Sequence, residues 1–337
     1  MPLDVSHPVL PPPRGDLSAA VLSVLGGAAR PPAAEVVRQA DPYGDDLQLA
    51  LYLCYELHYR GFTGVDDAYE WDPVLLAFRG LLEDRFLTAL RADATRPRGV
   101  DEALAELLVE PVNGTGVSHH LRDEGQLWQL REYAAQRSLY HLKEADPHAW
   151  VLPRLWGRAK AGMAAVEFDE YGGGRADRVH ARLFADLMAD LGLDTAYGRY
   201  LDSASAQTLA TVNLMSLFGL HRRLRGALVG HFAAVEITSS PGSRRLAQAM
   251  ARTGAGPAAE HFYAEHVVAD AVHEQVVRRE VVGGLLEVEP HLADDVVFGL
   301  DATGFLEDRL ADHLLDHWRA GTTSLRVPLG PSDGRAS

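Results

Sequence analysis

Cysteine is almost absent from this sequence: Cys54 is the single example among 337 residues. One cysteine cannot close an intrachain disulfide, and thiolate-bound zinc or iron–sulfur sites are excluded because they need several such ligands. Cys54 lies in an apolar run, where a small core residue is the ordinary interpretation. Nothing in the cysteine usage indicates an oxidising compartment, and we expect a cytoplasmic protein.

Long apolar runs and positive charge are also scarce. No stretch of about 18 apolar residues is present, so no membrane helix is expected. The proline-rich start lacks the basic and apolar parts of a signal peptide. Lys and Arg number 32 against 47 Asp and Glu, which gives a formal net charge of −15. Such a chain repels phosphate groups, so neither nucleic acid nor a membrane is expected as a partner.

Alternating runs that form strands are nearly absent, apart from the short stretch Ser324 to Pro328. A dinucleotide-binding motif is missing too, because GGGR at 172–175 follows no predicted strand and lacks the G-x-G-x-x-G spacing. Ala, Leu, Arg and Glu dominate instead, and these residues favour helices. No internal repeat is visible, which argues against a solenoid. The sequence therefore predicts an all-α fold.

Helix boundaries follow from apolar periodicity together with capping residues, Pro and Gly. Pro147 is expected to end one long helix, and Pro241 to separate two others. The predicted helices cover about 16–25, 31–39, 43–59, 73–92, 101–109, 123–145, 153–172, 176–191, 205–220, 222–237, 241–251, 257–282, 290–301 and 304–319.

The same pattern predicts four regions. Residues 1–15 contain five prolines and are expected to form a flexible arm, and residues 323–337 a loose tail. A stretch with Gly and Pro at 111–121 is the best candidate boundary. It separates an N-terminal helical region, 16–121, from a C-terminal helical bundle, 122–322. The N-terminal helices are also a candidate homodimer interface.

Three candidate metal ligands recur on one predicted helix. His266, Asp270 and His273 stand at i, i+4 and i+7, which places them on one helical stripe. Two imidazoles and a carboxylate suit a divalent first-row metal, iron in particular, and manganese accepts the same ligands. A solvated polar face is the ordinary alternative. The flanking Val and Ala residues favour burial, where such groups need partners or a metal.

Further candidates lie on three other segments. Glu236 follows small apolar residues, where a carboxylate is costly unless it is paired or ligating; a helix-end Glu turned to water is the alternative. Glu170 and His180 flank three glycines, which break the helix and let both side chains point at one centre. Glu167 or Asp169 could take the place of Glu170.

Glu144 is expected in the last turn of its helix, where a carboxylate opposes the helix dipole. A residue that breaks a local rule is a candidate for function. With it, four helical segments each supply one to three nitrogen or oxygen ligands, as helical bundles do when they build dinuclear carboxylate sites. Any one of these acids alone is better interpreted as a capping or solvated residue, so the prediction depends on the set.

These segments together resemble the haem-oxygenase-like diiron oxidases and oxygenases, also described as iron-containing redox enzymes. In that family a lone Glu precedes a Glu and His pair, a further Glu follows, and an H-x-x-x-D-x-x-H helix completes the set. The likeness covers at least residues 122–280. The segments that carry it are SLYHLKEADPHAWVLPRLWGRAKA, DEYGGGRADRVHARLFADLM, VEITSSPGSRRLAQAM and FYAEHVVADAVHEQV. The resemblance implies seven metal ligands: Glu144, Glu170, His180, Glu236, His266, Asp270 and His273.

The resemblance also implies a haem-oxygenase-like helical bundle without haem, here with an additional N-terminal helical region. It implies two iron ions that change between Fe2+ and Fe3+, with O2 as co-substrate and no catalytic residue beyond the metal ligands. Members with the full ligand set resemble amine N-oxygenases, so a small amine or amino-acid-like substrate and a role in specialised metabolism are expected. Electrons come from an external donor, because no flavin or nicotinamide motif is present.

Alternative functions and residues stay open at this point. Desaturation or C–C fragmentation of amino or fatty acids is one alternative, and a helical cofactor-binding or scaffold protein without oxygenase activity is another. Three arginines are candidates for binding a substrate carboxylate, or form an exposed helix face: Arg175, Arg178 and Arg182. A further group of acids and imidazole is interpreted as structural, since its first two members do not share a helix face: Glu56, His58 and Glu70.

Overall fold

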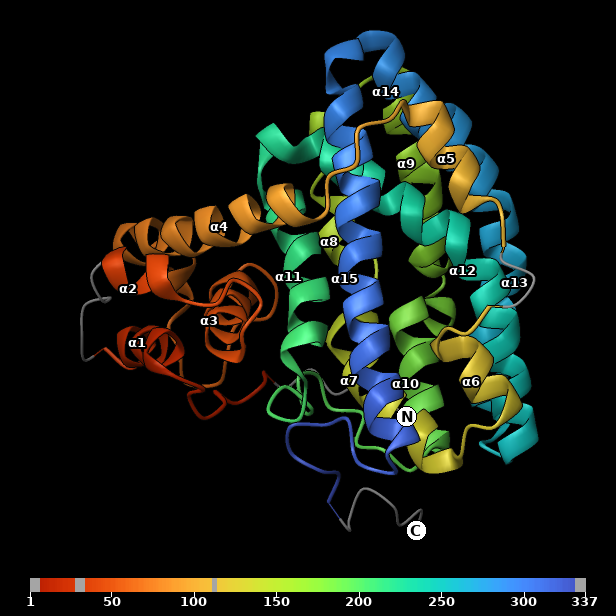
Figure 1. Cartoon of the computed structure of the whole chain (residues 1–337), viewed down its shortest axis with the longest axis horizontal. Helices are drawn as coiled ribbons and strands as arrows, with labels where there is room; N and C mark the ends of the chain where they lie inside the picture. Colours follow the sequence, from red (N-terminus) through yellow and green to blue (C-terminus); the bar gives the residue numbers. More distant parts are fainter. Residues whose placement is uncertain (1–6, 28–33, 111–113, 331–337) are drawn as a thin grey trace.

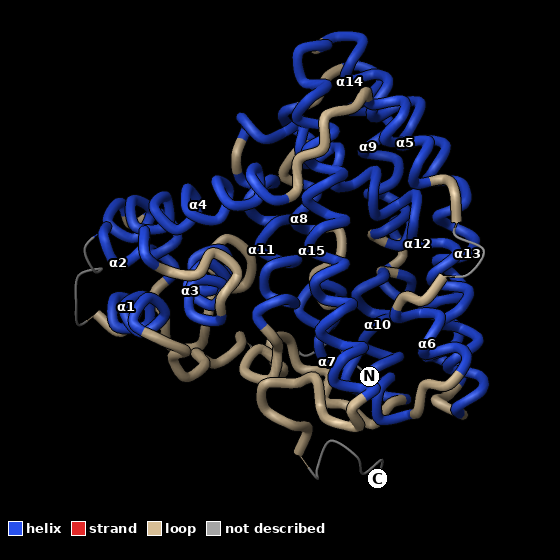
Figure 2. Tube along the Cα trace, viewed as in Figure 1, coloured by secondary structure: helices blue, strands red, loops and turns tan. Residues whose placement is uncertain are grey.

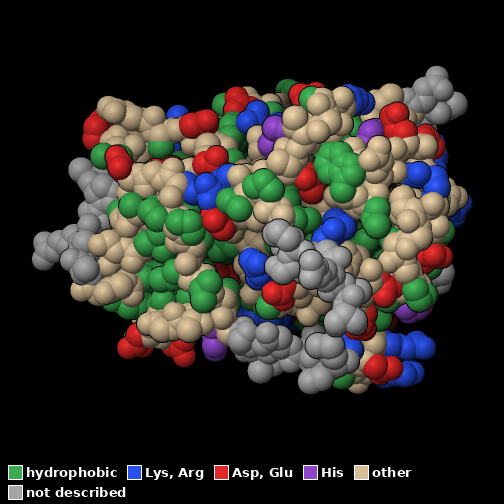
Figure 3. All heavy atoms as spheres, turned by 90° about the horizontal axis from the view of Figure 1, so that it is seen from below, with side chains coloured by type: hydrophobic (Ala, Val, Ile, Leu, Met, Phe, Trp, Pro, Cys, Tyr) green, Lys and Arg blue, Asp and Glu red, His purple; other side chains and the backbone are tan. Residues whose placement is uncertain are grey.

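The computed structural model describes residues 7–27, 34–110 and 114–330, apart from the side chains of Val268, Asp270 and Ala271. Every regular element in these ranges is a helix (Figure 2), which confirms the all-α prediction. None of the helices within them is long and apolar enough to cross a membrane. On the face of the molecule in Figure 3, acidic and basic side chains lie interspersed.

The first helices form a layer beside the main bundle, on the left of Figure 1. Asp72 begins the longest of them, because its carboxylate accepts from the Leu75 amide at 2.8 Å and Pro73 occupies the first helical position. Helix α3 packs on both α1 and α4, and α2 packs on α4. The layer consists of α1 (Asp16–Leu25), α2 (Ala34–Gln39), α3 (Asp45–Glu56), a 3-10 turn (Asp67–Trp71) and α4 (Pro73–Asp93).

The main bundle is built from seven longer helices and several short ones. The longer helices are α7 (Leu127–His141), α9 (Gly157–Glu170), α10 (His180–Asp190), α11 (Ala206–Leu220), α12 (Arg225–Thr253), α13 (Pro257–Val276) and α15 (Ala293–Arg319). The short helices are α5 (Val100–Leu107), α6 (Val117–Asp123), α8 (Asp146–Ala149) and α14 (Gly283–Val288), and a π-helical segment (Val277–Val282) joins α13 to α14. Both α5 and α6 contact α12 and α15, so the chain joins the bundle soon after α4.

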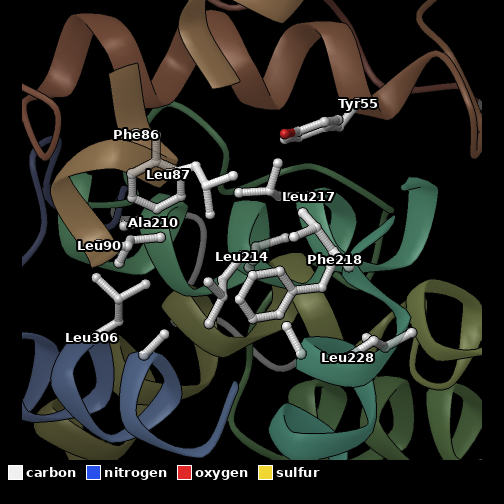
Figure 4. Packing of buried hydrophobic residues seen from close by; sticks show 14 of the residues in the cluster. Tyr55, Phe86, Leu87, Leu90, Ala210, Leu214, Leu217, Phe218, Leu228 and Leu306 are labelled. Carbon is white, nitrogen blue, oxygen red and sulfur yellow. The ribbon is translucent and has the colours of Figure 1, made fainter. Parts of the chain in front are cut away.

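Helix α11 connects the layer with the bundle. Its sequence is apolar on all sides, which is the pattern of a helix buried all round. Figure 4 shows Leu217 of this helix near side chains of the N-terminal layer, while Phe218 and Leu214 face the bundle. Phe86 from the layer and Phe218 from α11 are both fully buried. Each such side chain contributes about 1.5–3 kcal/mol to folding, so layer and bundle share one apolar core.

Several helix boundaries differ from the prediction. Helix α12 is continuous from Arg225 to Thr253 although Pro241 lies inside it, so the predicted break is wrong. Proline removes one helical N–H, but burial of one face of α12 on both sides of Pro241 outweighs that loss. Likewise α15 is one helix instead of the two predicted. Helix α7 ends at His141, before the expected Ala145, and turns follow it up to Ala145, whose φ of 76° cannot continue a right-handed helix.

The two ends of the described chain lie against the molecule. The carbonyl of Pro8 accepts from the Thr63 amide at 2.8 Å, so the predicted arm 1–15 is held at its described end. In the predicted tail 323–337, Ser324 donates from its amide and its hydroxyl to Glu132, at 2.9 and 2.8 Å. Residues 1–6 and 331–337 lie outside the described part of the chain.

Candidate metal centre

The structure brings six of the seven predicted ligands into the interior of the bundle, and all six are buried. They come from four helices and one turn. Glu144 lies in the turn after α7, Glu170 ends α9, His180 begins α10, Glu236 lies in the middle of α12, and His266 and His273 lie on α13. The side chain of the seventh, Asp270, is outside the described part of the chain, so its role stays a prediction.

The turn that carries Glu144 is fixed from outside the bundle. Arg60 donates to the carbonyl of Leu142 at 3.1 Å, and Lys143 forms an ion pair with Glu56 at 2.8 Å. Both contacts come from the N-terminal part of the chain. Because Lys143 is anchored in that direction, its neighbour Glu144 is directed into the bundle.

Glycine brings Glu170 and His180 together. The chain turns sharply between α9 and α10 at Gly172, which has a φ of 74°. A Cβ at Gly172 would lie 2.7 Å from the backbone carbon of Arg178, so no other residue fits without a shift. This close approach places His180 Nδ1 2.6 Å from Glu170 Oε2, although the pair lies ten residues apart.

The ligand atoms form two groups that share Glu170. Atoms of Glu144, Glu170, His180 and His266 lie within 4.8 Å of one another. Atoms of Glu170, Glu236 and His273 do so as well. A carboxylate that belongs to both groups is placed where a bridging ligand of a dinuclear site would stand.

In the first group, the His266 ring is oriented by its own helix. Its Nδ1 donates to the carbonyl of Phe262 at 2.8 Å, which makes Nε2 the acceptor nitrogen of the neutral ring. That Nε2 lies 3.8 Å from Glu144 Oε1. The contact between His180 and Glu170, though short, lacks the geometry of a hydrogen bond. Such lone-pair donors facing one point are what a metal ion requires.

In the second group, His273 lies among carboxylates. Its Nδ1 is 3.2 Å from Glu236 and 3.7 Å from Glu170, and its Nε2 is 3.3 Å from the more exposed Asp169. Burial alone would lower the pKa of His273, but hydrogen bonding and attraction from Glu236 outweigh it and raise that pKa to about 9. A metal ion at this nitrogen must displace the proton.

The acids of the site have fewer donors than burial requires. Glu144 Oε2 and both oxygens of Glu167 have no hydrogen-bond partner among the residues that the structure describes. Glu167 is only 2% exposed, and its burial beside Glu170 and Glu236 raises its pKa to about 9. Buried carboxylates that face one another are costly unless cations join them. The oxygen and imidazole donors present fit iron or manganese.

A cavity of about 370 Å³ opens beside this centre. Glu144, Glu170, Glu236 and His266 border it at one end. Apolar side chains of α12 and α15 form part of its wall, and the exposed Asp308 also borders it. Its size suits a small organic molecule.

The structure also settles where the other candidate residues lie. Glu56 pairs with Lys143, whereas His58 faces Glu70 at 3.0 Å, so that group does not converge on one point. Arg175 pairs with Asp177 on the surface. None of the three arginines predicted as carboxylate binders is among the described residues that line the cavity.

Sequence reasoning missed histidines around the centre. His141 Nδ1 donates to Glu144 at 2.9 Å, and this bond, with the attraction of the imidazole, outweighs burial and holds the pKa of Glu144 well below its usual range. The spacing of His141 and Glu144, three residues apart, was the available signal. His148 and His231 lie farther along and contact each other at 3.2 Å. No local spacing links those two, which are 83 residues apart.

Comparison with known proteins gives two findings. The profile of a family described as iron-containing redox enzymes matches residues 131–307, which include all seven predicted ligands. The nitrosourea synthase of Streptomyces achromogenes subsp. streptozoticus is 24% identical over 161 residues. The aligned part is 48% of this chain and 34% of that relative, so the match spans about a third of the relative's length.

Proposed function

The chain belongs to the iron-containing redox enzymes, and from this premise we propose that it is a non-haem diiron enzyme that uses O2 to oxidise the nitrogen of a small amine or amino-acid-like substrate. The observation that carries the proposal is the pair of buried ligand groups joined at Glu170. One metal site requires one such group, whereas a shared carboxylate between two groups supports a pair of ions.

The residues divide between the two ions as follows. Glu144, His180 and His266 would hold one iron, and Glu236 and His273 the other, with Glu170 common to both. Asp270 joins the second set by its sequence position, one helical turn before His273. The iron pair, when bound, supplies the reduction of O2, with electrons from an external donor.

The protein's own contribution is charge and shape. Three buried carboxylates offset the charge of the ions, and His141 keeps Glu144 ionised. A small molecule in the cavity would lie beside Glu144, Glu170 and His266, which line it. The apolar part of its wall would limit the access of water to the reacting atoms.

Two observations support a nitrogen substrate. The carboxylates of the centre are offset by the ions, and Glu307 is paired with Arg137, so the exposed Asp308 is the acid at the cavity that favours entry of a cationic amine over an anion. In addition, the relative with 24% identity is named for a nitrogen compound, a nitrosourea.

The test begins with anaerobic loading of the full chain with Fe2+. Two irons per chain and a coupled pair in the Mössbauer spectrum are expected. O2 consumption is then followed with a panel of primary amines and amino acids, against the matching alcohols and carboxylic acids. Mass spectrometry is expected to find oxygen on the substrate nitrogen. One iron per chain contradicts the diiron proposal, and oxidation at carbon with the nitrogen unchanged contradicts N-oxygenation.

A further inference from the structure

Two buried histidines stand beside the cavity outside the ligand set. His148, on α8, is 2% exposed, and His231, on α12, is 1% exposed. Their Nε2 atoms lie 3.2 Å apart. His148 lines the cavity together with Thr303 of α15, and the ring of Phe232 packs at 5.0 Å from it. Neither histidine is used by the proposed metal centre.

The positions of the protons in this group follow from Thr303. Its Oγ1 lies 2.7 Å from the carbonyl oxygen of Gly299, which can only accept, so the single hydroxyl proton is directed there. His231 Nδ1 lies 2.8 Å from the same Oγ1. Because that hydroxyl proton is already engaged, His231 Nδ1 must carry a hydrogen and donate it to Thr303.

The same reasoning passes from His231 to His148. Burial lowers the pKa of His231 to about 4 and the pKa of His148 well below its usual range, so both rings are neutral. A neutral His231 with a hydrogen on Nδ1 has an acceptor at Nε2. The contact of 3.2 Å is then a hydrogen bond only if His148 donates from its own Nε2. His148 Nδ1 therefore carries a lone pair.

His148 lines the cavity, and Nδ1 is the ring nitrogen that the contact with His231 leaves free. His148 Nδ1 has no hydrogen-bond partner within the described chain. Unlike Glu144 Oε2, which is also without a partner, it is accessible to solvent. The side chain as a whole is almost completely buried and lines the cavity. The accessible nitrogen is thus an acceptor presented to whatever occupies this space.

We propose that His148 Nδ1 accepts a hydrogen bond from an N–H group of the substrate and so holds the substrate nitrogen beside the metal centre, with His231 and Thr303 as positioning residues that fix its tautomer. The inference rests on the proposed function, since it assumes a nitrogen substrate. It narrows the substrate class to a nitrogen that carries at least one hydrogen, such as a protonated amine or a guanidinium, and excludes quaternary ammonium compounds. Because His148 is neutral and weakly basic, it orients the nitrogen without removing its proton.

The first experiment measures the tautomer directly. The full chain, labelled with 15N at histidine and loaded with diamagnetic Zn2+, gives the protonated nitrogen of each ring by NMR. We expect His148 to be protonated at Nε2 and bare at Nδ1. Thr303→Val removes the acceptor of His231 Nδ1–H, so His231 shifts its hydrogen to Nε2 and His148 changes to the opposite tautomer. Thr303→Ser keeps the hydroxyl and is the matched control. A hydrogen on Nδ1 of His148 in the unchanged protein overturns the inference.

The second experiment measures recognition with two probes of equal charge. n-Butylammonium carries N–H groups, whereas butyltrimethylammonium carries none. In the Zn2+-loaded chain, His148→Phe keeps an aromatic ring of similar size but removes the acceptor. We expect about tenfold weaker binding of n-butylammonium in this variant by titration calorimetry, and unchanged binding of the quaternary probe. Equal binding of n-butylammonium in both proteins, or its failure to bind the unchanged protein, refutes the role of His148.

These two experiments use no O2 and no iron. If the tautomer and the probe binding follow the expectation while the iron-loaded protein consumes no O2 with amines, the proposed oxidation is wrong and the amine-binding role of His148 stands. If O2 is consumed with amines but His148→Phe binds n-butylammonium normally, the proposed function stands and the inference about His148 fails.

Discussion

The buried acids near the turn 142–145 differ in their hydrogen-bond partners. Glu56 is completely buried, and it receives Lys143 Nζ at 2.8 Å and the Tyr197 hydroxyl at 2.7 Å. Glu144 Oε2 and both oxygens of Glu167, in contrast, have no donor among the described residues. A buried acid with a full set of partners is structural, whereas buried acids that face other acids indicate a site for cations.

Lys143 and Glu144 are adjacent in sequence, but Lys143 contacts the structural acid Glu56 and Glu144 belongs to the candidate metal centre. The Lys143 ammonium lies 4.1 Å from the centre of the Tyr59 ring and 5.1 Å from that of Tyr52, in addition to its ion pair with Glu56. One residue later, Glu144 points to the candidate metal centre. The N-terminal layer therefore supports the centre although it supplies no ligand to it.

The largest effect is expected when an imidazole of the candidate metal centre is removed. His266→Ala and His273→Ala should each lose one of the two irons per chain, because each takes a nitrogen from a different ligand group. Iron per folded chain is the measurement. His261→Ala is the control, since His261 lies on the same helix but is exposed, and it should keep both irons. Full iron content in both ligand variants contradicts the assignment.

Replacing the structural acid Glu56 should lower the stability of the chain instead of its iron content. Glu56→Gln leaves the Lys143 charge buried without its counter-ion, which should lower the free energy of unfolding by about 3–5 kcal/mol. Urea unfolding of the metal-free chain measures this loss. The double variant Glu56→Gln with Lys143→Met removes both charges and should be less destabilised than the single one. A single variant as stable as the unchanged protein would mean that this pair is not a structural ion pair.

The sequence predicts those parts of the fold and of the candidate site that depend on residues close together in the chain. The candidate ligands come from patterns within one helix or one turn, such as the spacing of His266 and His273, and from the resemblance of the whole set. The helices are predicted for the same reason, since apolar periodicity is local. Pro241 shows the limit, because the local rule predicts a break and the buried face of α12 prevents it.

Partners that are distant in sequence could not be predicted. Lys143 and Glu56 lie 87 residues apart, and neither has a neighbour that indicates the other. The same holds for His148 and His231, whose roles depend on a contact between two helices. Glu167 was recognised only as a substitute for Glu170, because the sequence does not show that its oxygens are buried without donors.

Glu167 belongs to both sides of the comparison, because it is a buried acid beside the candidate metal centre and its burial also changes the stability of the chain. Its pKa of about 9 in the folded, metal-free chain is above its ordinary value of 4.5, because of burial and the nearby Glu170 and Glu236. The folded state keeps a proton that the unfolded state releases, so stability falls as pH rises from about 4.5 to 9, by at most about 1.4 kcal/mol per pH unit. Glu167→Gln should flatten this dependence in urea unfolding of the metal-free chain.

Glu132→Gln is the matched control for that measurement. Glu132 is buried as well, but it accepts from Trp318 and twice from Ser324, so its replacement should cost stability because these donors lose a charged acceptor. If the free energy of unfolding depends on pH in the same way in the unchanged protein and in Glu167→Gln, then the pKa of Glu167 is not raised by its burial beside other acids. Iron should remove the difference between the unchanged protein and Glu167→Gln in how the free energy of unfolding depends on pH. Two cations beside Glu167 would favour its ionised form and balance its charge.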